Sequence, residues 1–417
     1  MLELFPETAL VADGVLSVGG CDVDALAAEH GTPLVVYCER TVRSAARAYR
    51  AAAPPETLVA YGTKAFANVA LLRVLAEEGM GADVSTLGEL AYALAAGVPG
   101  ERLVFHGNNK SDEELRAAAA AGALVVLDSL EEPERARAAG VERVLVRLTP
   151  GVEAATHRSI RTAHEESKFG LGARDALAAI DAAQRLGLDV LGLHVHIGSQ
   201  LARVDETLLT ADRVGEFCLR ARDELGWTPR VVDLGGGLGI AHVPSERPPS
   251  IPEWVCAVVA HFRSAWPEPV GLILEPGRSL VGRAGTTLYR IGVVKESGGV
   301  AYAAVDGGMS DNPRPQLYGA QYTALLANRA GEPADGEFRI AGKHCESGDV
   351  LIDGVALPRP RRGDLLAVPA TGAYTLAMGS TYNGVPRPAV VLVADGRARV
   401  IRRRETPDDV LALETEL

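Results

Sequence analysis

The sequence predicts an α/β fold, in which eight parallel strands and their connecting helices close into a (β/α)8 barrel of the TIM type. A mainly antiparallel β domain of the barrel or sandwich kind completes it. Three observations predict this fold. Short apolar segments alternate with amphipathic helical segments between residues 40 and 283, and period-two patterns broken by Gly and Pro follow. Polar residues follow many of the apolar segments, as in a barrel, whereas an open doubly wound sheet, the competing arrangement, collects them at one switch point.

The barrel strands are expected where apolar segments rich in β-formers recur along the chain. They are 58–61, 81–84, 103–106, 124–127, 144–147, 190–196, 231–234 and 272–274. Several of the helices between them open with a capping box, in which Ser or Thr and a Glu three residues later satisfy free N–H groups of the first turn. These pairs are Thr86 with Glu89, Ser111 with Glu114, and Ser129 with Glu132.

The second domain is predicted from the two ends of the chain. Residues 284–417 contain alternating segments at 287–294, 365–368 and 389–393. Residues 1–39 contain strand-like segments at 15–18 and 33–38 around a helical segment at 23–30. Because these early strands precede the alternating strands and helices of the barrel, we expect both to join the sheet of the second domain.

Composition limits the classes of partner. The chain has 417 residues, 47% of them hydrophobic, and a net charge of −12, which disfavours nucleic acid and anionic membranes. A small molecule is the expected partner. The five cysteines lack CxxC spacing, so neither a disulfide framework nor a zinc site is indicated and a reducing cytoplasm is expected. A basic and apolar leader is missing from the first residues, and no apolar run approaches the ~18 residues that a membrane span needs.

The segment Val59 to Ala65 is an apolar strand that ends at Lys64. A lysine at the mouth of an apolar barrel is partly desolvated, which lowers its pKa and frees the amine to form a Schiff base. The alternative is a surface lysine beyond a strand end.

The sixth strand ends in two histidines followed by Gly198 and Ser199. Alternation places His194 and His196 on one face of this strand. His196 lying flat on an aromatic cofactor, with Ser199 on a phosphate, is the functional interpretation. The alternatives are two hydrogen-bonded core histidines, or a metal site whose third ligand the sequence does not reveal.

The seventh and eighth strands end in a glycine run and in an acidic turn. Successive glycines, including Gly236 and Gly237, expose backbone N–H groups that can cradle a phosphate. The eighth strand ends in Glu275, Pro276, Gly277 and Arg278. Loops after strands seven and eight commonly bind phosphate in these barrels. Glu275 would favour a protonated pyridine nitrogen, and its alternative role is a salt bridge with Arg278.

These features together indicate pyridoxal 5′-phosphate as the cofactor. It needs a lysine for a Schiff base, a ring partner, a phosphate cradle and a carboxylate for its pyridinium nitrogen.

Polar clusters interrupt the second domain at 306–314, 343–349 and 371–374. Such clusters between strands are typical of functional loops. Arg314 suits a substrate carboxylate, because guanidinium binds carboxylate in bidentate fashion. Cys345 has charged and polar neighbours, which makes it the best candidate for a reactive thiol among the five cysteines, and a buried, inert thiol is the alternative.

The chain resembles the meso-diaminopimelate decarboxylase family of fold-type III pyridoxal-phosphate enzymes. The resemblance runs almost end to end. It rests on YGTKA (61–65), HGNNK (106–110), GVEAATH (151–157), TAHE (162–165), SKFGLG (167–172), HVHIGSQ (194–200), DLGGGLGI (233–240), EPGR (275–278), DGGMSDNPR (306–314), GKHCESGD (342–349), ATGAY (370–374) and YNGVPRPAVV (382–391).

The resemblance implies roles for residues at matching positions. Lys64 would bind the cofactor covalently, with Asp83 beside it and His196 on the ring. The phosphate and pyridine nitrogen would contact Ser199, Gly236, Gly237, Glu275, Pro276, Gly277, Arg278 and Tyr374. Substrate would contact Arg278, Arg314, Tyr318, Glu346 and Tyr374, and Cys345 would donate the proton.

The resemblance also implies the reaction: decarboxylation of meso-2,6-diaminopimelate to L-lysine and CO2, the last step of lysine biosynthesis. It implies a homodimer with active sites shared between subunits, completed by the second domain. The alternatives are a decarboxylase for ornithine, lysine or a carrier-bound glutamyl group, a racemase, and a non-catalytic cofactor carrier. A racemase would have an arginine in place of Glu275, and a carrier would lack the second domain.

Overall fold

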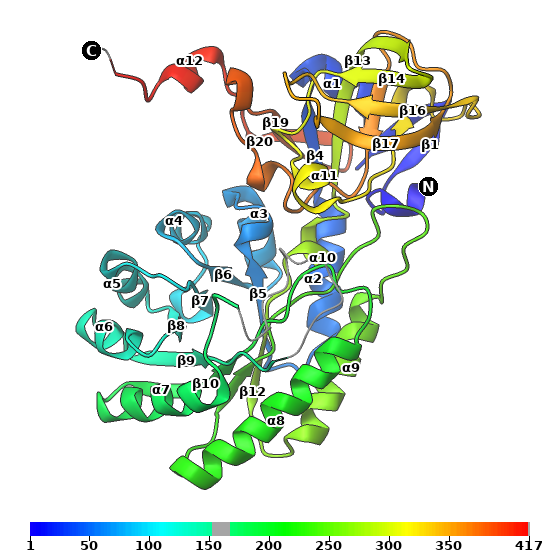
Figure 1. Ribbon diagram of the computed structural model, residues 1–417. Helices are drawn as coiled ribbons and strands as arrows, with labels where there is room; N and C mark the ends of the chain where they lie inside the picture. Colours follow the sequence, from blue (N-terminus) through cyan, green and yellow to red (C-terminus); the bar gives the residue numbers. More distant parts are fainter. Residues whose placement is uncertain (152–166, 416–417) are drawn as a thin grey trace. The chain divides into compact units, whose positions relative to one another are not determined.

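The structure is a computed structural model that describes residues 1–151 and 167–415. The chain divides into two compact units (Figure 1). The barrel unit comprises residues 45–239 and 247–280, and the β unit comprises residues 1–44, 240–246 and 281–417.

The barrel unit contains the eight predicted strands in a closed parallel barrel, which confirms the predicted fold class. The strands follow one another around the barrel, and the last pairs with the first. They are β5 (Leu58–Gly62), β6 (Gly81–Val84), β7 (Leu103–Phe105), β8 (Leu124–Leu127), β9 (Arg143–Arg147), β10 (Asp189–His194), β11 (Val231–Asp233) and β12 (Gly271–Leu274).

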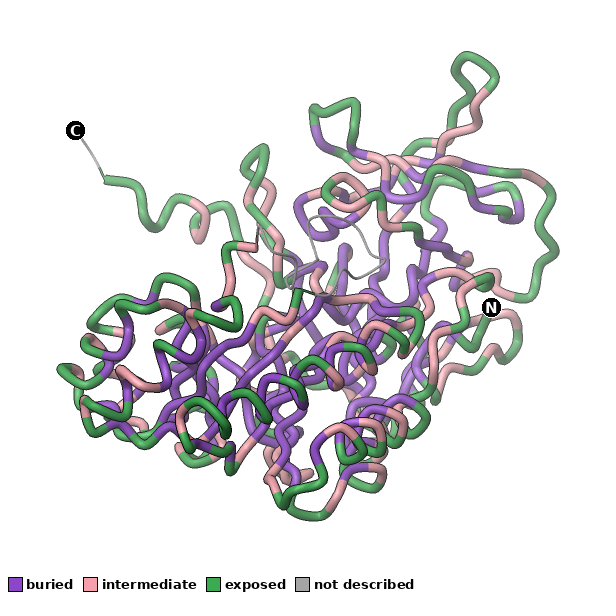
Figure 2. Tube along the Cα trace, turned by 60° about the horizontal axis from the view of Figure 1, so that its bottom comes forward, coloured by how far each residue is buried: buried purple, intermediate pink, exposed green. Residues whose placement is uncertain are grey.

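Helices before and between these strands lie on the outside of the barrel (Figure 1). They include α2 (Glu39–Ala52), α3 (Val69–Glu77), α4 (Leu87–Ala96), α5 (Asp112–Ala121), α6 (Glu132–Ala138), α7 (Ala173–Arg185), α8 (Asp205–Leu225) and α9 (Ile251–Ala265). The barrel strands are almost continuously buried (Figure 2), as expected for parallel strands covered on both faces. Their interior is filled by small and branched side chains, among them Ala60, Val104, Val126, Leu145 and Ile273.

The three predicted capping boxes have different outcomes. Ser111 and Glu114 form the complete box at the start of α5. Thr86 caps α4 through the Glu89 N–H, but the Glu89 carboxylate accepts from Ser85 instead of Thr86.

The third predicted box, Ser129 with Glu132, is wrong. The N-cap of α6 is Glu131, without a side-chain cap. The Glu132 carboxylate is instead buried, where it accepts from the Asp128 N–H and from Lys110. A contact from another loop therefore replaces the local one.

The β unit is built on a large mixed sheet in the order β17-β16-β14-β13-β4-β19-β20. Its strands are β4 (Leu34–Cys38), β13 (Gly285–Ser297), β14 (Val300–Val305), β16 (Gly336–Ala341), β17 (Val350–Leu357), β19 (Ala389–Ala394) and β20 (Arg397–Arg402). In addition, β18 (Leu365–Val368) pairs with β13, and β15 (Leu325–Leu326) pairs with β18. Most pairs are antiparallel, as predicted, while β4 with β19 and β14 with β16 are parallel.

The early strands divide between two sheets. The segment at 33–38 joins the large sheet as β4, as predicted. The segment at 15–18, expected in the same sheet, lies instead as β2 (Val15–Val18) in a separate sheet with β1 (Leu10–Ala12) and β3 (Cys21–Asp22). The Asp13-Gly14 turn has positive φ at both residues, so it pairs β2 with β1 locally. Helix α1 (Val23–His30) follows.

Two hydrophobic clusters fill the β unit, and β13 contributes to both. Leu288 belongs to the cluster that includes Leu16, Val36 and Val391. Tyr289 and Ile291 belong to the cluster that includes Ile340 and Leu366. Within the described part of the chain, no helix is both long and apolar enough to cross a membrane.

Candidate active site at the barrel strand ends

Glu275 is a buried carboxylate at the end of β12, held by two histidines. Its Oε1 lies 2.6 Å from Nε2 of His106, and its Oε2 lies 3.2 Å from Nε2 of His194. Burial acts to raise the pKa of Glu275, but His106 and His194 outweigh it, and the pKa lies well below its usual range. Glu275 therefore keeps its charge in an apolar setting.

Asp233 lies beside Glu275 and behaves in the opposite way. Burial and the neighbouring Glu275 charge raise the pKa of Asp233 well above its usual range. Its Oδ1 accepts from the Gly235 N–H at 2.8 Å. The pKa of His194 falls to about 3, mainly because of burial.

The ligating atoms of His106, His194, Asp233 and Glu275 lie within 4.8 Å of one another. A metal ion can be bound by such a set, but the Glu275 carboxylate already contacts both histidines within it. The prediction of His194 as a hydrogen-bonded core residue fits this geometry.

Lys64 and Asp83 meet at the ends of adjacent strands. Lys64 lies in the short 3₁₀ helix that follows β5, and its Nζ donates to Oδ2 of Asp83 at 2.6 Å. The Asp83 side chain is 3% exposed and that of Lys64 46% exposed. Oδ1 of Asp83 lies 3.7 Å from Nε2 of His106, so Asp83 links the lysine to the Glu275 cluster.

His196 lies beyond the end of β10, where the sequence predicts a longer strand. The Gly236 N–H donates to its Nδ1 at 3.4 Å, so this nitrogen carries no proton. Burial, followed by the charges of Lys64 and Arg147, lowers the pKa of His196 well below its usual value. A neutral imidazole results.

The glycine loop after β11 passes close to its neighbours. A Cβ on Gly236 would lie 2.2 Å from the carbonyl oxygen of Glu275, and Gly237 has φ +119°. Neither position accepts a side chain without a shift of the backbone. Arg278 donates to Oγ of Ser199 at 3.1 Å, and the Pro276 carbonyl accepts from the Gly62 N–H at 3.1 Å. Gly277 precedes the short helix α10 (Arg278–Val281).

The residues predicted in the β unit lie in three of its segments, one of which forms the short helix α11. Arg314 begins α11 (Arg314–Tyr318) and is 4% exposed. Its Nη1 donates to Nε2 of His242 at 2.9 Å and to the Tyr322 hydroxyl, while its buried Nε has no hydrogen-bond partner among the described residues. The Tyr318 hydroxyl lies 3.7 Å from Sδ of Met378, and Tyr374 has φ +59°.

Cys345 and Glu346 are exposed on a loop fixed by Asp349. The Asp349 carboxylate is 3% exposed and accepts from both the N–H and the ring of His344, and from the Met309 N–H. The Cys345 N–H donates to Oδ1 of Asn383 at 3.0 Å. Two polar clusters of the sequence, 306–314 and 343–349, thus meet at one carboxylate.

Three residues of the barrel site carried no predicted role: Asp233, His106 and Arg147. His106 directly follows β7, and Arg147 is the last residue of β9. The signal available was their position, because each stands at the end of a predicted strand and His106 opens the HGNNK segment. Residues 152–157 of GVEAATH and all of TAHE (162–165) lie outside the described residues.

Comparison with known proteins identifies the family. Residues 39–282 match the model of the pyridoxal-dependent decarboxylases, pyridoxal binding domain. The chain is 46% identical to the diaminopimelate decarboxylase of Mycobacterium tuberculosis, over 96% of this chain and 95% of that protein. The chain belongs to the diaminopimelate decarboxylases.

Other relatives agree. The diaminopimelate decarboxylase of Bacillus subtilis is 43% identical over 96% of this chain and 95% of its own. The crystal structure of the M. jannaschii diaminopimelate decarboxylase in complex with L-lysine matches with a TM-score of 0.92 and 33% identity, covering 99% of this chain and 98% of that one. The Vibrio vulnificus lysine/ornithine decarboxylase is less similar, with a TM-score of 0.79 and 26% identity over 89% of this chain and 97% of that chain.

This diaminopimelate decarboxylase family member is therefore a lyase that depends on pyridoxal phosphate, and its barrel residues fit that cofactor. An anionic Glu275 matches a protonated pyridine nitrogen, and a neutral His196 can lie against a ring. The N–H groups of Gly237 and Gly277 have no hydrogen-bond partner among the described residues, which suits a phosphate.

Proposed function

We propose that this enzyme converts meso-2,6-diaminopimelate to L-lysine and CO2, the last step of lysine biosynthesis. The observation that carries the proposal is the match, along nearly the whole chain, to diaminopimelate decarboxylases at 41–46% identity. The lysine bound to the M. jannaschii relative is the expected product.

Cofactor binding is assigned mainly to the barrel unit, with Tyr374 contributed by the β unit. Lys64 would bind the cofactor covalently, with Asp83 orienting its amine. Glu275 would hold the pyridine nitrogen, and Ser199, Gly236, Gly237, Pro276, Gly277, Arg278 and Tyr374 would surround the phosphate. When bound, pyridoxal phosphate accepts the electron pair that the departing CO2 leaves behind.

Substrate recognition is assigned mainly to the β unit. Arg314 is buried, and no carboxylate of the described residues pairs with it, so its charge and its Nε are available for a substrate carboxylate. Glu346 matches the distal ammonium group, and Arg278, Tyr318 and Tyr374 complete the contacts. Cys345, exposed on its fixed loop, would donate the proton that replaces the carboxylate.

The same proposal includes the assembly and its place in the cell. We expect a homodimer in the cytoplasm, in which the domains 40–283 and 1–39 with 284–417 contribute to shared active sites. The fixed, exposed loop of Cys345 supports this arrangement, since such a loop can serve a neighbouring subunit.

The decisive assay supplies meso-diaminopimelate, lysine and ornithine separately to the purified enzyme with pyridoxal phosphate. We expect L-lysine and CO2 from the first and little turnover of the others. Release of cadaverine or putrescine, without lysine from diaminopimelate, would replace the proposal with a lysine or ornithine decarboxylase.

The position of the covalent bond is tested by borohydride reduction and peptide mapping. The cofactor should label Lys64, and a Lys64→Ala variant should remain unlabelled. Label on another lysine would overturn the assignment.

A further inference from the structure

We propose that Asp128 is a positioning residue for Arg147, and that the buried ion pair of Lys110 and Glu132 holds Asp128 in place. Arg147 then serves as a fixed cation of the cofactor site. The inference rests on the cofactor of the family and is independent of the substrate.

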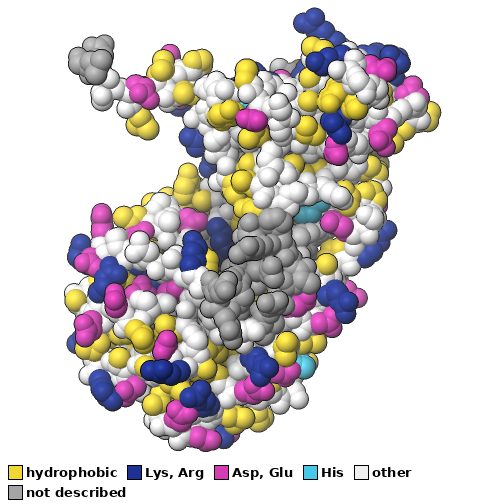
Figure 3. All heavy atoms as spheres, viewed as in Figure 1, with side chains coloured by type: hydrophobic (Ala, Val, Ile, Leu, Met, Phe, Trp, Pro, Cys, Tyr) yellow, Lys and Arg dark blue, Asp and Glu magenta, His cyan; other side chains and the backbone are white. Residues whose placement is uncertain are grey.

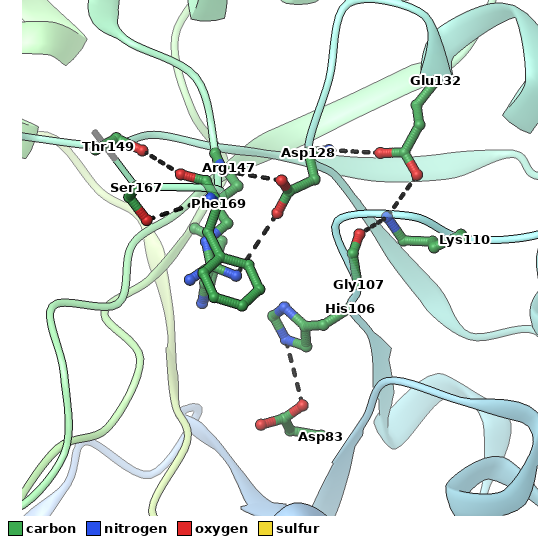
Figure 4. Close-up of polar contacts among 12 residues, drawn as sticks. Asp83, His106, Gly107, Lys110, Asp128, Glu132, Arg147, Thr149, Ser167 and Phe169 are labelled. Atoms are coloured by element: carbon green, nitrogen blue, oxygen red, sulfur yellow. Dashed lines mark hydrogen bonds and ion pairs between the residues drawn. The ribbon is translucent and has the colours of Figure 1, made fainter. Parts of the chain in front are cut away.

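Arg147 is held on two sides at the end of β9. Arg147 is 7% exposed. Nη1 lies 3.6 Å from Oδ2 of Asp128, and the guanidinium carbon lies 4.6 Å from the centre of the Phe169 ring (Figure 4). A buried guanidinium needs such compensation, because an unpaired charge in the interior is costly.

The position of Arg147 places it beside the Glu275 cluster. Arg147 pairs with His194 in the register of β9 and β10, and the next residue, Leu148, donates to the His194 carbonyl at 2.9 Å. Burial lowers the pKa of Arg147, while the charges of Asp128, Glu275 and Asp83 act to raise it. Arg147 in turn lowers the pKa of His196. Arg147 is thus electrostatically coupled to three predicted cofactor residues.

Hydrogen bonds to its backbone hold Phe169 in place. Its carbonyl accepts from Oγ1 of Thr149 at 2.7 Å, and its N–H donates to Oγ of Ser167 at 3.2 Å (Figure 4). The N–H of the next residue, Gly170, donates to Oδ1 of Asp128 at 2.8 Å. Asp128 therefore contacts both Arg147 and the segment that carries Phe169.

Behind Asp128 lies a second buried ion pair. The Asp128 N–H donates to Oε2 of Glu132 at 2.5 Å, and Oε1 of Glu132 accepts from Nζ of Lys110 at 2.7 Å. Nζ also donates to the Gly107 carbonyl at 2.7 Å (Figure 4). The side chains of Lys110 and Glu132 are 0% and 4% exposed.

This arrangement gives the HGNNK segment (106–110) two contacts with the site. His106, at its start, bonds to Glu275, and Lys110, at its end, reaches Asp128 through Glu132. A buried ion pair is rarely the most stable solution, because apolar residues of similar volume are often as good or better. Its position behind Asp128 favours a role in placing charge.

The test is a double-mutant cycle on binding of pyridoxal phosphate to the full-length apoenzyme, followed by absorbance without substrate. Arg147→Met and Asp128→Asn should each raise the dissociation constant about tenfold, since one lost charge interaction shifts an equilibrium by that order. The double variant should bind as Arg147→Met does, because Asp128 acts through Arg147.

A matched control is Asp364→Asn in the β unit. Asp364 is equally buried, accepts from Arg329 Nη1 at 2.8 Å and from the Arg361 N–H at 2.8 Å, and has no proposed part in cofactor binding. The dissociation constant of pyridoxal phosphate from the Asp364→Asn variant should stay within about twofold of the wild-type value.

Two results would overturn the proposal: an unchanged constant for Arg147→Met, or additive effects of the two substitutions. If Asp128→Asn fails to fold by circular dichroism, Glu132→Gln replaces it in the same cycle with the same expected non-additivity. If the enzyme produced no lysine from diaminopimelate, the proposed substrate would be rejected. The cofactor-binding cycle would still test the role of Asp128, because it uses no substrate.

Discussion

Glu275 illustrates how single residues set the chemistry of this barrel. Two histidines from the ends of β7 and β10 convert a site that would protonate an acid into one that keeps it charged. A charged carboxylate is the form that can hold a pyridinium nitrogen.

Replacing His106 by Leu should therefore weaken cofactor binding in a pH-dependent way. Without His106 the pKa of Glu275 rises. On acidification, the Glu275 carboxylate is then protonated at a higher pH than in the wild type. Where the raised pKa exceeds the pH, the dissociation constant of pyridoxal phosphate should increase about tenfold for each unit between them, so the increase should be larger at pH 6 than at pH 8. Titration of the apoenzyme at both pH values measures it, and equal effects at both would refute it.

Asp311 predicts a pH dependence of stability. Burial raises its pKa to about 7, whereas an unfolded aspartate has a pKa of about 3.9. Between these values the folded protein binds more protons than the unfolded one, so this residue's contribution to the free energy of unfolding decreases as pH rises.

Urea unfolding between pH 4.5 and 7 should show this contribution as a difference from the Asp311→Asn variant. The stability of the wild type should decrease relative to that of Asp311→Asn as pH rises. Parallel pH curves for the two proteins would exclude the assignment.

At the scale of elements, local sequence was sufficient where the determinant was local. All eight barrel strands were predictable because buried parallel strands are continuous apolar runs, and Ser111 with Glu114 forms its cap within one turn. Glu132 was mispredicted because Lys110, 22 residues earlier, binds its carboxylate. The separate sheet of β2 and the role of Arg147 likewise depend on contacts that spacing alone does not reveal.

The loop of Cys345 yields a prediction of its own. Asp349 accepts three hydrogen bonds that fix this loop, so Asp349→Ala should lower kcat at least about tenfold while the affinity for pyridoxal phosphate is retained. Steady-state kinetics together with cofactor titration measure both. Unchanged kcat would show that the loop does not need this anchor.

At the scale of the whole molecule, the predicted residues fall into two sets. Lys64, Asp83, His196 and Glu275 belong to the barrel unit, and Arg314, Tyr318, Cys345, Glu346 and Tyr374 belong to the β unit. The sequence motifs predicted both sets, but spacing along the chain cannot show whether they contribute to one site. On the face in Figure 3, acidic and basic side chains are interspersed, in keeping with a small-molecule partner.

Mixing two inactive variants tests the proposed shared sites. Lys64→Ala and Cys345→Ala lack residues from different sets, so subunit exchange should restore up to about a quarter of the wild-type activity, from one intact site in half of the dimers. Each variant incubated alone is the control. Absence of recovery, with exchange verified by differently tagged subunits, would place both residues of each site in one chain.

The long strand β13 has a consequence for how the β unit opens. Because Leu288 packs in one hydrophobic cluster while Tyr289 and Ile291 pack in the other, neither cluster can come apart without disturbing the strand they share. Amide hydrogens in β4 and β14, which pair with β13 on either side, should therefore exchange with solvent in a single concerted opening. A substitution that makes a cavity in either cluster should therefore speed amide exchange in both β4 and β14.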